Sequence, residues 1–232
     1  MKRAALKRSA LKRTAPVTFL TLLILFALPW RHGAHAGTIA GTVDLPETSE
    51  QQRPVRYYRG PYRAATGAGR VEPSPFENVV IYIDGAPRKA APDAVSAQAV
   101  VRQRQDRFVP HVLAVVAGTT VSFPNDDNYY HNVFSIVAGD RFDLGRYGRG
   151  ESADQLFEQP AVVVVRCEIH AGRKAYIVVL DSELFTVPDK DGRYELEVPG
   201  GSYALKAWHP EGVRSYQVDV PESDSVTVDI SL

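Results

Sequence analysis

The sequence is poor in sulfur. Its 232 residues include one cysteine, Cys167, and one methionine, the initial Met1. A single cysteine excludes a fold held together by intramolecular disulfides. A free thiol is a liability in an oxidising compartment, so we expect Cys167 to be buried, reactive or bound to a metal.

The sequence also lacks an apolar run long enough to cross a membrane. The longest candidate, from Val17 to Trp30, has about 14 residues, whereas a spanning helix needs about 20. A basic segment precedes this run, and Ala34-His35-Ala36 follows it with the small-x-small pattern of a cleavage site. We therefore expect residues 1–36 to be a cleaved signal peptide rather than a retained anchor, and the mature chain to be periplasmic or secreted.

The chain as a whole has no formal net charge, with 27 basic and 27 acidic residues. Residues 1–36 contain seven of the basic residues and none of the acidic ones, so cleavage leaves a net charge of about −7. An acidic mature chain is a poor partner for nucleic acid, which requires clustered positive charge. We expect no nucleic-acid partner, and no membrane span after cleavage.

The sequence after Gly37 predicts an all-β fold. Short apolar or alternating runs recur between turn signals, which is typical of a β-sandwich. The expected strands are 38–45, 79–83, 109–116, 119–123, 131–137, 161–167, 175–180, 194–198, 203–208, 213–220 and 226–232. Two segments break the pattern. Residues 46–75 predict a long loop with a candidate contact patch at 56–63, and residues 90–107 predict either a helix or an extended edge segment.

Three residues form a candidate metal site. His131 follows a dense turn signal at 124–128, Cys167 ends the β-branched run 161–167, and His170 lies in the following loop. Antiparallel neighbouring strands would place all three at one end of a sandwich. Two imidazoles and one thiolate on a rigid β-scaffold are the trigonal ligand set that suits a copper ion in electron transfer.

Other interpretations of these residues stay open. One is an inert buried thiol at Cys167 beside two hydrogen-bonded histidines, and another is a thiol nucleophile with a histidine base. The second is disfavoured because the cysteine follows a strand and not the start of a helix, where the dipole lowers the thiol pKa. His111 and His209 are expected to be ordinary structural residues, and Tyr129 and Tyr130 to cover the site or pack its loop.

The segment from about residue 108 to 180 resembles the cupredoxin, or blue type 1 copper, family. The resemblance is carried by FPNDDNYYHNVFS at 123–135, FDLGRYGRGES at 142–152 and CEIHAGRKAYIVV at 167–179. It is strongest with plastocyanin- and amicyanin-like members of the methylamine-utilisation type. The resemblance implies a Greek-key β-sandwich that binds one copper ion through His131, Cys167 and His170.

The sequence departs from the family pattern in the ligand loop. Arg173 occupies the position of the family's axial methionine and Ala171 that of its proline, and the mature chain has no other methionine. Three equatorial ligands can hold copper without the axial one, and its loss is expected to raise the reduction potential. We expect Arg173 to point to solvent or to pair with an acid such as Glu168. A high-potential electron carrier, an altered metal preference and a degenerate site all remain open.

A second resemblance involves the two ends of the chain. Residues 38–85 and 185–212 resemble the two halves of a carboxypeptidase-regulatory-like, transthyretin-type sandwich. The expected organisation is a signal peptide at 1–36, a first half-sandwich at 37–87, a cupredoxin-like domain at 88–180 and a second half-sandwich at 181–232. Two tandem or merged sandwiches are the alternative.

Together these features predict an exported mononuclear copper protein that is not an enzyme and carries single electrons between periplasmic redox partner proteins. A copper storage or delivery module is one alternative. A β-sandwich interaction protein with a degenerate site is another.

Overall fold

The computed structural model describes residues 36–46, 74–86, 99–137, 141–170 and 172–232, all within one compact unit. Within these ranges the chain is nearly all β, and its only helix is a short 3-10 turn at Pro75–Asn78. The prediction of an all-β sandwich fold is confirmed. No helix among the described residues has the length and apolarity to span a membrane. The expected signal peptide, most of the 46–75 loop with its 56–63 patch, and residues 90–98 lie outside the described residues.

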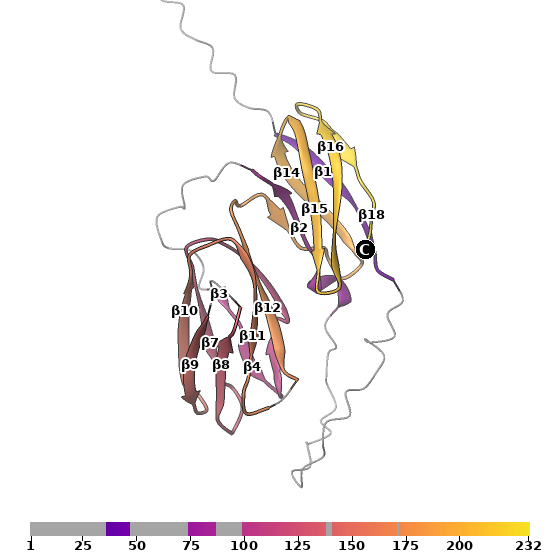
Figure 1. Ribbon diagram of the computed structural model, residues 1–232. Coiled ribbons are helices and arrows are strands. Elements are labelled where there is room, and N and C mark those ends of the chain that lie inside the picture. The colour runs from indigo at the N-terminus through magenta and orange to yellow at the C-terminus, as the bar shows by residue number, and fades with distance from the viewer. Residues whose placement is uncertain (1–35, 47–73, 87–98, 138–140, 171) are drawn as a thin grey trace, which may run out of the picture. The chain divides into compact units, whose positions relative to one another are not determined.

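Two sheets combine strands from both ends of the described chain (Figure 1). The first sheet contains β1 (Ala36–Asp44), β14 (Arg193–Pro199), β17 (Ser225–Thr227) and β18 (Ile230–Ser231). The second contains β13 (Phe185–Thr186), β2 (Val80–Asp84), β15 (Gly201–His209) and β16 (Gly212–Val220). Alternate residues of β14 are buried and exposed, as expected for a sheet with one face on a core. Residues such as Ile39, Leu196, Ile81 and Leu205 meet in that core.

The strands between β2 and β13 form three further sheets. A three-stranded sheet has the order β10 (Ser152–Phe157), β7 (Thr119–Pro124), β3 (Ala99–Val100). A five-stranded sheet has the order β6 (Val112–Val116), β12 (Lys174–Leu180), β11 (Ala161–Arg166), β8 (His131–Ser135), β9 (Phe142–Tyr147). The third is a hairpin of β4 (Arg102–Arg104) and β5 (Arg107–Val109). Phe123 and Phe157 from the three-stranded sheet pack with Val163 and Ile177 from the five-stranded sheet.

Strand β12 contributes to two cores, because both of its faces are buried. Ile177 and Val179 point to the core just described, whereas Tyr176, Val178 and Leu180 pack in a third cluster with Val80 of β2 and Trp208 of β15. Tyr176 and Trp208 meet edge to face, with ring centroids 5.4 Å apart. This double burial explains why residues 175–180 form a continuous apolar run in place of an alternating one.

Some local predictions need correction. Residues 99–107 form strands β3, β4 and the start of β5, so the helical interpretation of 90–107 is wrong where the structure describes it. Strands β9 and β10 were not predicted, because most of their exposed residues are polar or charged and neither strand has a continuous apolar run. Strand β11, formed by the expected β-branched run, is central in its sheet, although Val162 is 37% exposed.

Candidate metal centre

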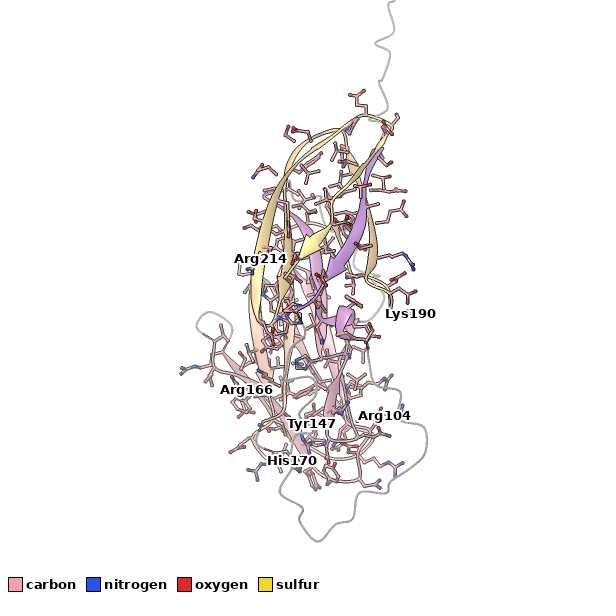
Figure 2. All side chains as sticks on the ribbon, turned by 90° about the vertical axis from the view of Figure 1, so that its right-hand side faces the viewer. Arg104, Tyr147, Arg166, His170, Lys190 and Arg214 are labelled. Carbon is pink, nitrogen blue, oxygen red and sulfur yellow. The ribbon has the colours of Figure 1, made fainter. Side chains whose placement is uncertain are left out.

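The structure brings His131, Cys167 and His170 together at one end of the five-stranded sheet. His131 is the first residue of β8, and Cys167 directly follows β11, which runs antiparallel beside it with Arg166 opposite Phe134. His170 lies in the short loop that leads into β12. Figure 2 shows His170, Tyr147 and Arg104 at the same end of the molecule. The three candidate ligands are therefore held by the ends of two paired strands and one tight loop.

The candidate ligand atoms face one another. The Cys167 Sγ lies 3.6 Å from Nδ1 of His131 and 3.9 Å from Nδ1 of His170. One ligand atom from each of the three residues lies within 4.8 Å of the others, and the two imidazole rings meet edge to face with centroids 5.0 Å apart. Among the described residues, no carboxylate and no further histidine joins this cluster.

These distances fit a single metal ion. Metal–thiolate and metal–imidazole bonds of about 2.3 and 2.0 Å, at trigonal angles, place sulfur and nitrogen about 3.7 Å apart. The two sulfur–nitrogen distances of 3.6 and 3.9 Å lie on either side of that value. The ligand set is also chemically suitable, because soft thiolate and borderline imidazole ligands favour copper or zinc over calcium or magnesium.

Asp127 fixes the orientation of the His131 ring. Its Oδ2 lies 3.0 Å from Nε2 of His131, so this nitrogen carries the proton that the carboxylate accepts. The lone pair of the ring is then on Nδ1, which faces Cys167. A carboxylate behind a metal-binding histidine sets its tautomer and increases its basicity. In the sequence, Asp127 is part of the dense turn signal at 124–128, which does not indicate this role.

The electrostatics favour the metal-binding protonation states of Cys167 and His170, whereas protons compete with a metal for His131. Burial raises the pKa of the Cys167 thiol, but the interaction of the thiolate with the His131 ring, in its protonated form, and with nearby backbone N–H groups outweighs burial and lowers the pKa to about 7. Burial and the positive Arg173 lower the pKa of His170, which keeps this imidazole neutral. Burial lowers the pKa of His131, but its hydrogen bonds to Cys167 and Asp127 raise it by more.

Arg173 points into the site and not to solvent. Its side chain is only 6% exposed, and its Nη1 lies 3.3 Å from Nδ1 of His131. A guanidinium has five N–H donors and no lone pair, so Arg173 cannot replace the missing methionine as a ligand. Its Nε is buried without a hydrogen-bond partner. Arg173 pairs with an acid, as one of the two expectations had it, but the acid is Asp106, and Glu168 pairs with Arg146 on the surface.

Asp106 reaches the site from the turn of the β4–β5 hairpin. This two-residue turn places Gln105 and Asp106 at φ angles of 52° and 65°, a region that few residues other than glycine, asparagine and aspartate adopt. The backbone N–H groups of both residues donate to the carboxylate of Asp127, at 2.7 and 3.1 Å. One carboxylate therefore connects the hairpin turn with the ring of His131. The sequence does not indicate this connection, because Gln105-Asp106 is not a typical turn pair and lies far from Cys167 along the chain.

Tyr129 covers the two histidines, in agreement with one of its predicted roles. Its ring centroid lies 5.0 Å from that of His131 and 5.2 Å from that of His170, and its hydroxyl donates to Asp106. Tyr130 is 63% exposed. His111 and His209 lie away from the candidate ligands: His111 contacts the Tyr176 ring edge to face, and His209 ends β15. Neither belongs to the candidate metal cluster.

Comparisons with known proteins give matches only among solved structures. No protein-family model and no curated protein matches the chain. A novel purple cupredoxin from Nitrosopumilus maritimus is 25% identical, covering 36% of this chain and 100% of its own, with a TM-score of 0.33. The Cu(I) form of a methionine-to-alanine mutant of amicyanin is 19% identical, covering 43% of this chain and 98% of its own, with a TM-score of 0.35.

A third match is the Cu-containing nitrite reductase from Thermus scotoductus SA-01. It is 27% identical and covers 48% of this chain but only 28% of its own, with a TM-score of 0.35. All three alignments leave more than half of the present chain unmatched. The functional proposal below therefore depends on the geometry of the three side chains.

Proposed function

We propose that the protein binds one copper ion through Sγ of Cys167 and Nδ1 of His131 and His170. The observation that carries this proposal is the convergence of these three atoms at distances that suit a trigonal metal site. Copper bound in this way supplies a centre that alternates between its monovalent and divalent states. The chain supplies a fixed ligand geometry, and the lowered pKa of Cys167 provides a thiolate at neutral pH.

Single-electron transfer is the role that this site supports best. Two of the ligands, His131 and Cys167, lie at the ends of paired strands with buried surroundings, so they resist movement between oxidation states. His170 is partly exposed, whereas His131 and Cys167 are buried. His170 is therefore the ligand closest to a redox partner. The cupredoxin-type site without an axial methionine, the periplasmic location and the redox partner proteins belong to this proposal.

We also propose a domain organisation on the basis of the sheets. Strands β3–β12 would form the copper domain, and β1 and β2 would form a transthyretin-type sandwich together with β13–β18. In this arrangement the copper domain is an insertion within the second sandwich.

Titration of the purified mature chain with Cu(II), followed by visible absorption and electron paramagnetic resonance, tests the proposal. We expect one equivalent to produce an intense thiolate-to-copper absorption and a reversible one-electron wave in voltammetry. Both should disappear in Cys167→Ser and persist in His111→Gln, which changes a histidine outside the cluster. Tight binding of colourless Cu(I) without a reversible wave would favour copper delivery. Absence of copper binding by the folded chain would contradict the proposal.

A further inference from the structure

We propose that Arg173, whose charge is balanced by Asp106, is a latch that competes with the metal for His131 and weakens the binding of divalent ions. This inference rests on the proposed metal site. It assigns to the guanidinium of Arg173, which lies beside the three candidate ligands, a role in determining which metal the site prefers. It also gives a function to the β4–β5 hairpin, which contributes no metal ligand.

The competition follows from the hydrogen bonds of His131. Asp127 accepts the proton on Nε2, so Nδ1 carries the only lone pair of the ring. Arg173 Nη1 is 3.3 Å from Nδ1 of His131, in position to donate to this lone pair. A metal ion needs the same lone pair. Arg173 must therefore release His131 before the metal can bind.

The position of Arg173 is costly, which indicates that it is specifically maintained. The guanidinium is almost fully buried, and its Nε–H has no acceptor. Its positive charge also lies beside two imidazoles that bind a cation in the proposed site. Among the described residues Asp106 balances it directly, and Asp106 occupies the left-handed backbone region in a turn held by Asp127. A solvent-facing arginine would avoid all of these costs.

The local charges predict the direction of the effect. The thiolate of Cys167 and the carboxylates of Asp106 and Asp127 carry three negative charges, and Arg173 carries one positive charge. Removing Arg173 increases the negative potential at the metal and frees Nδ1 of His131, so both changes favour a divalent ion. Removing the charge of Asp106 does the opposite, because the cation loses an attractive charge and, among the described side-chain hydrogen bonds, Arg173 is left with His131 as its partner.

The test measures the dissociation constant and uptake rate of Zn(II) by competition with a chromophoric chelator. We expect Arg173→Leu to tighten Zn(II) binding by about tenfold or more and to accelerate uptake, and Asp106→Asn to weaken binding by about tenfold. Leucine is chosen because it brings no new ligand atom. Arg149→Leu is the matched control, since it removes the same charge from an exposed loop and should change the constant less than about twofold.

The two variants are expected to change the Zn(II) affinity in opposite directions, and this distinguishes competition for His131 from simple support of the loop. If Arg173 only supports the loop, Arg173→Leu and Asp106→Asn both weaken Zn(II) binding, and the inference is overturned. Circular dichroism and thermal unfolding verify that each variant is folded. If the wild-type chain binds Zn(II) through Cys167 with an affinity equal to that of Arg173→Leu, the latch is wrong but the metal site stands. If neither chain binds Zn(II) or copper, the proposed function itself fails.

Discussion

At the scale of single residues, the candidate site depends on a buried amide as much as on its ligands. Asn125 is fully buried, and its Nδ2 donates to the carbonyls of Tyr129 and Tyr147. Its Oδ1 accepts the backbone N–H of Asp127 at 2.9 Å. These bonds fix the turn from which Asp127 reaches His131. A neutral amide performs this role without adding charge beside the metal site.

Replacing Asn125 with alanine should therefore destabilise the metal-free chain. Three hydrogen bonds are lost, and the buried carbonyl of Tyr147 and the partly buried one of Tyr129 lose a donor, so we expect the free energy of unfolding to fall by about 2–4 kcal/mol. Urea unfolding measures this change. Asn128→Ala is the control, because Asn128 is exposed and contacts only Arg149 through its side chain among the described bonds. Equal losses in both variants would contradict the role of Asn125.

Metal affinity should decrease as the pH falls, because protons compete with the metal for the thiolate. The thiol of Cys167 has a pKa lowered to about 7. Above this pH the thiolate is already present. Below it, each unit of pH lowers the thiolate fraction about tenfold, and the apparent Zn(II) affinity should follow. Zn(II) titrations between about pH 5.5 and 8.5 test this; a flat profile below pH 7 would show that Cys167 is not a ligand.

Single residues were predictable from the sequence where their chemistry is unusual. His131, Cys167 and His170 were identified because a thiol and two imidazoles near strand ends form a known metal-binding set. Asp106 and the orientation of Arg173 were not, because a charged residue in a turn or loop is ordinary in composition. Their role depends on a hairpin that returns to the site from far away in sequence.

At the scale of elements, turns with left-handed glycines connect the strands, and their surroundings differ. Gly192 and Gly150 have nearly the same φ angles, 80° and 81°. A Cβ on Gly192 would lie 2.9 Å from the ring of Phe76 and 3.0 Å from the carbonyl oxygen of Val43, whereas a Cβ on Gly150 would meet nothing within 4 Å. The two positions therefore separate backbone strain from steric conflict.

Alanine at these two positions should give unequal losses of stability. Gly150→Ala should cost about 1 kcal/mol, the ordinary penalty for a left-handed alanine. Gly192→Ala should cost about 2–3 kcal/mol, because the methyl group also displaces Phe76 or the β1 backbone. Thermal or urea unfolding of both variants measures the difference. A smaller loss for Gly192→Ala than for Gly150→Ala would contradict this account of the turn.

Elements were predictable where one or both of their faces are strongly apolar. Strands β11 and β12 are β-branched runs, and β14 alternates regularly, so their existence followed from the sequence. Strands β9 and β10 were missed because much of their surface is polar and solvent-facing. The hairpin of β4 and β5 was missed because its turn, Gln105-Asp106, lacks the glycine or asparagine that usually marks a two-residue turn.

At the scale of the whole molecule, the third cluster joins strands that belong to different sheets. Tyr176 and Val178 of β12 pack with Val80 of β2 and Trp208 of β15. Burial lowers the pKa of His209, the neighbour of Trp208, while the carboxylate of Glu211 partly opposes this effect. The Nδ1 of His209 accepts the backbone N–H of Glu211 at 3.4 Å, which protonation would prevent. The packed state therefore prefers a neutral His209.

Stability should consequently fall in mild acid. The unfolded chain protonates His209 below about pH 6.5, whereas the folded chain resists protonation, so lowering the pH favours unfolding. The contribution is fully present above about pH 6.5 and decreases by up to about 1.4 kcal/mol per unit of pH between that value and the lower folded pKa. Urea unfolding of the wild-type chain and His209→Gln at several pH values isolates this contribution. A difference between the two that does not change with pH would contradict it.

The arrangement of whole sheets was less accessible to sequence analysis than the strands themselves. The parallel pairing of β12 with β6, and of β1 with β17 and β18, joins segments that are distant in sequence. Apolar patterns indicate which faces are buried but not against which strand. The continuous apolar run of β12 is consistent with burial on both faces, but it does not identify Trp208 as one of its neighbours.

X-ray absorption at the copper edge tests the central claim most directly, because it counts the atoms bound to the metal. For the copper-loaded mature chain we expect one sulfur at about 2.2–2.3 Å and two imidazole nitrogens at about 2.0 Å. The sulfur shell should vanish in Cys167→Ser, and one imidazole shell should be lost in His131→Gln. A spectrum of the wild-type chain with only oxygen and nitrogen neighbours would contradict the assignment of Cys167, His131 and His170 as the copper site.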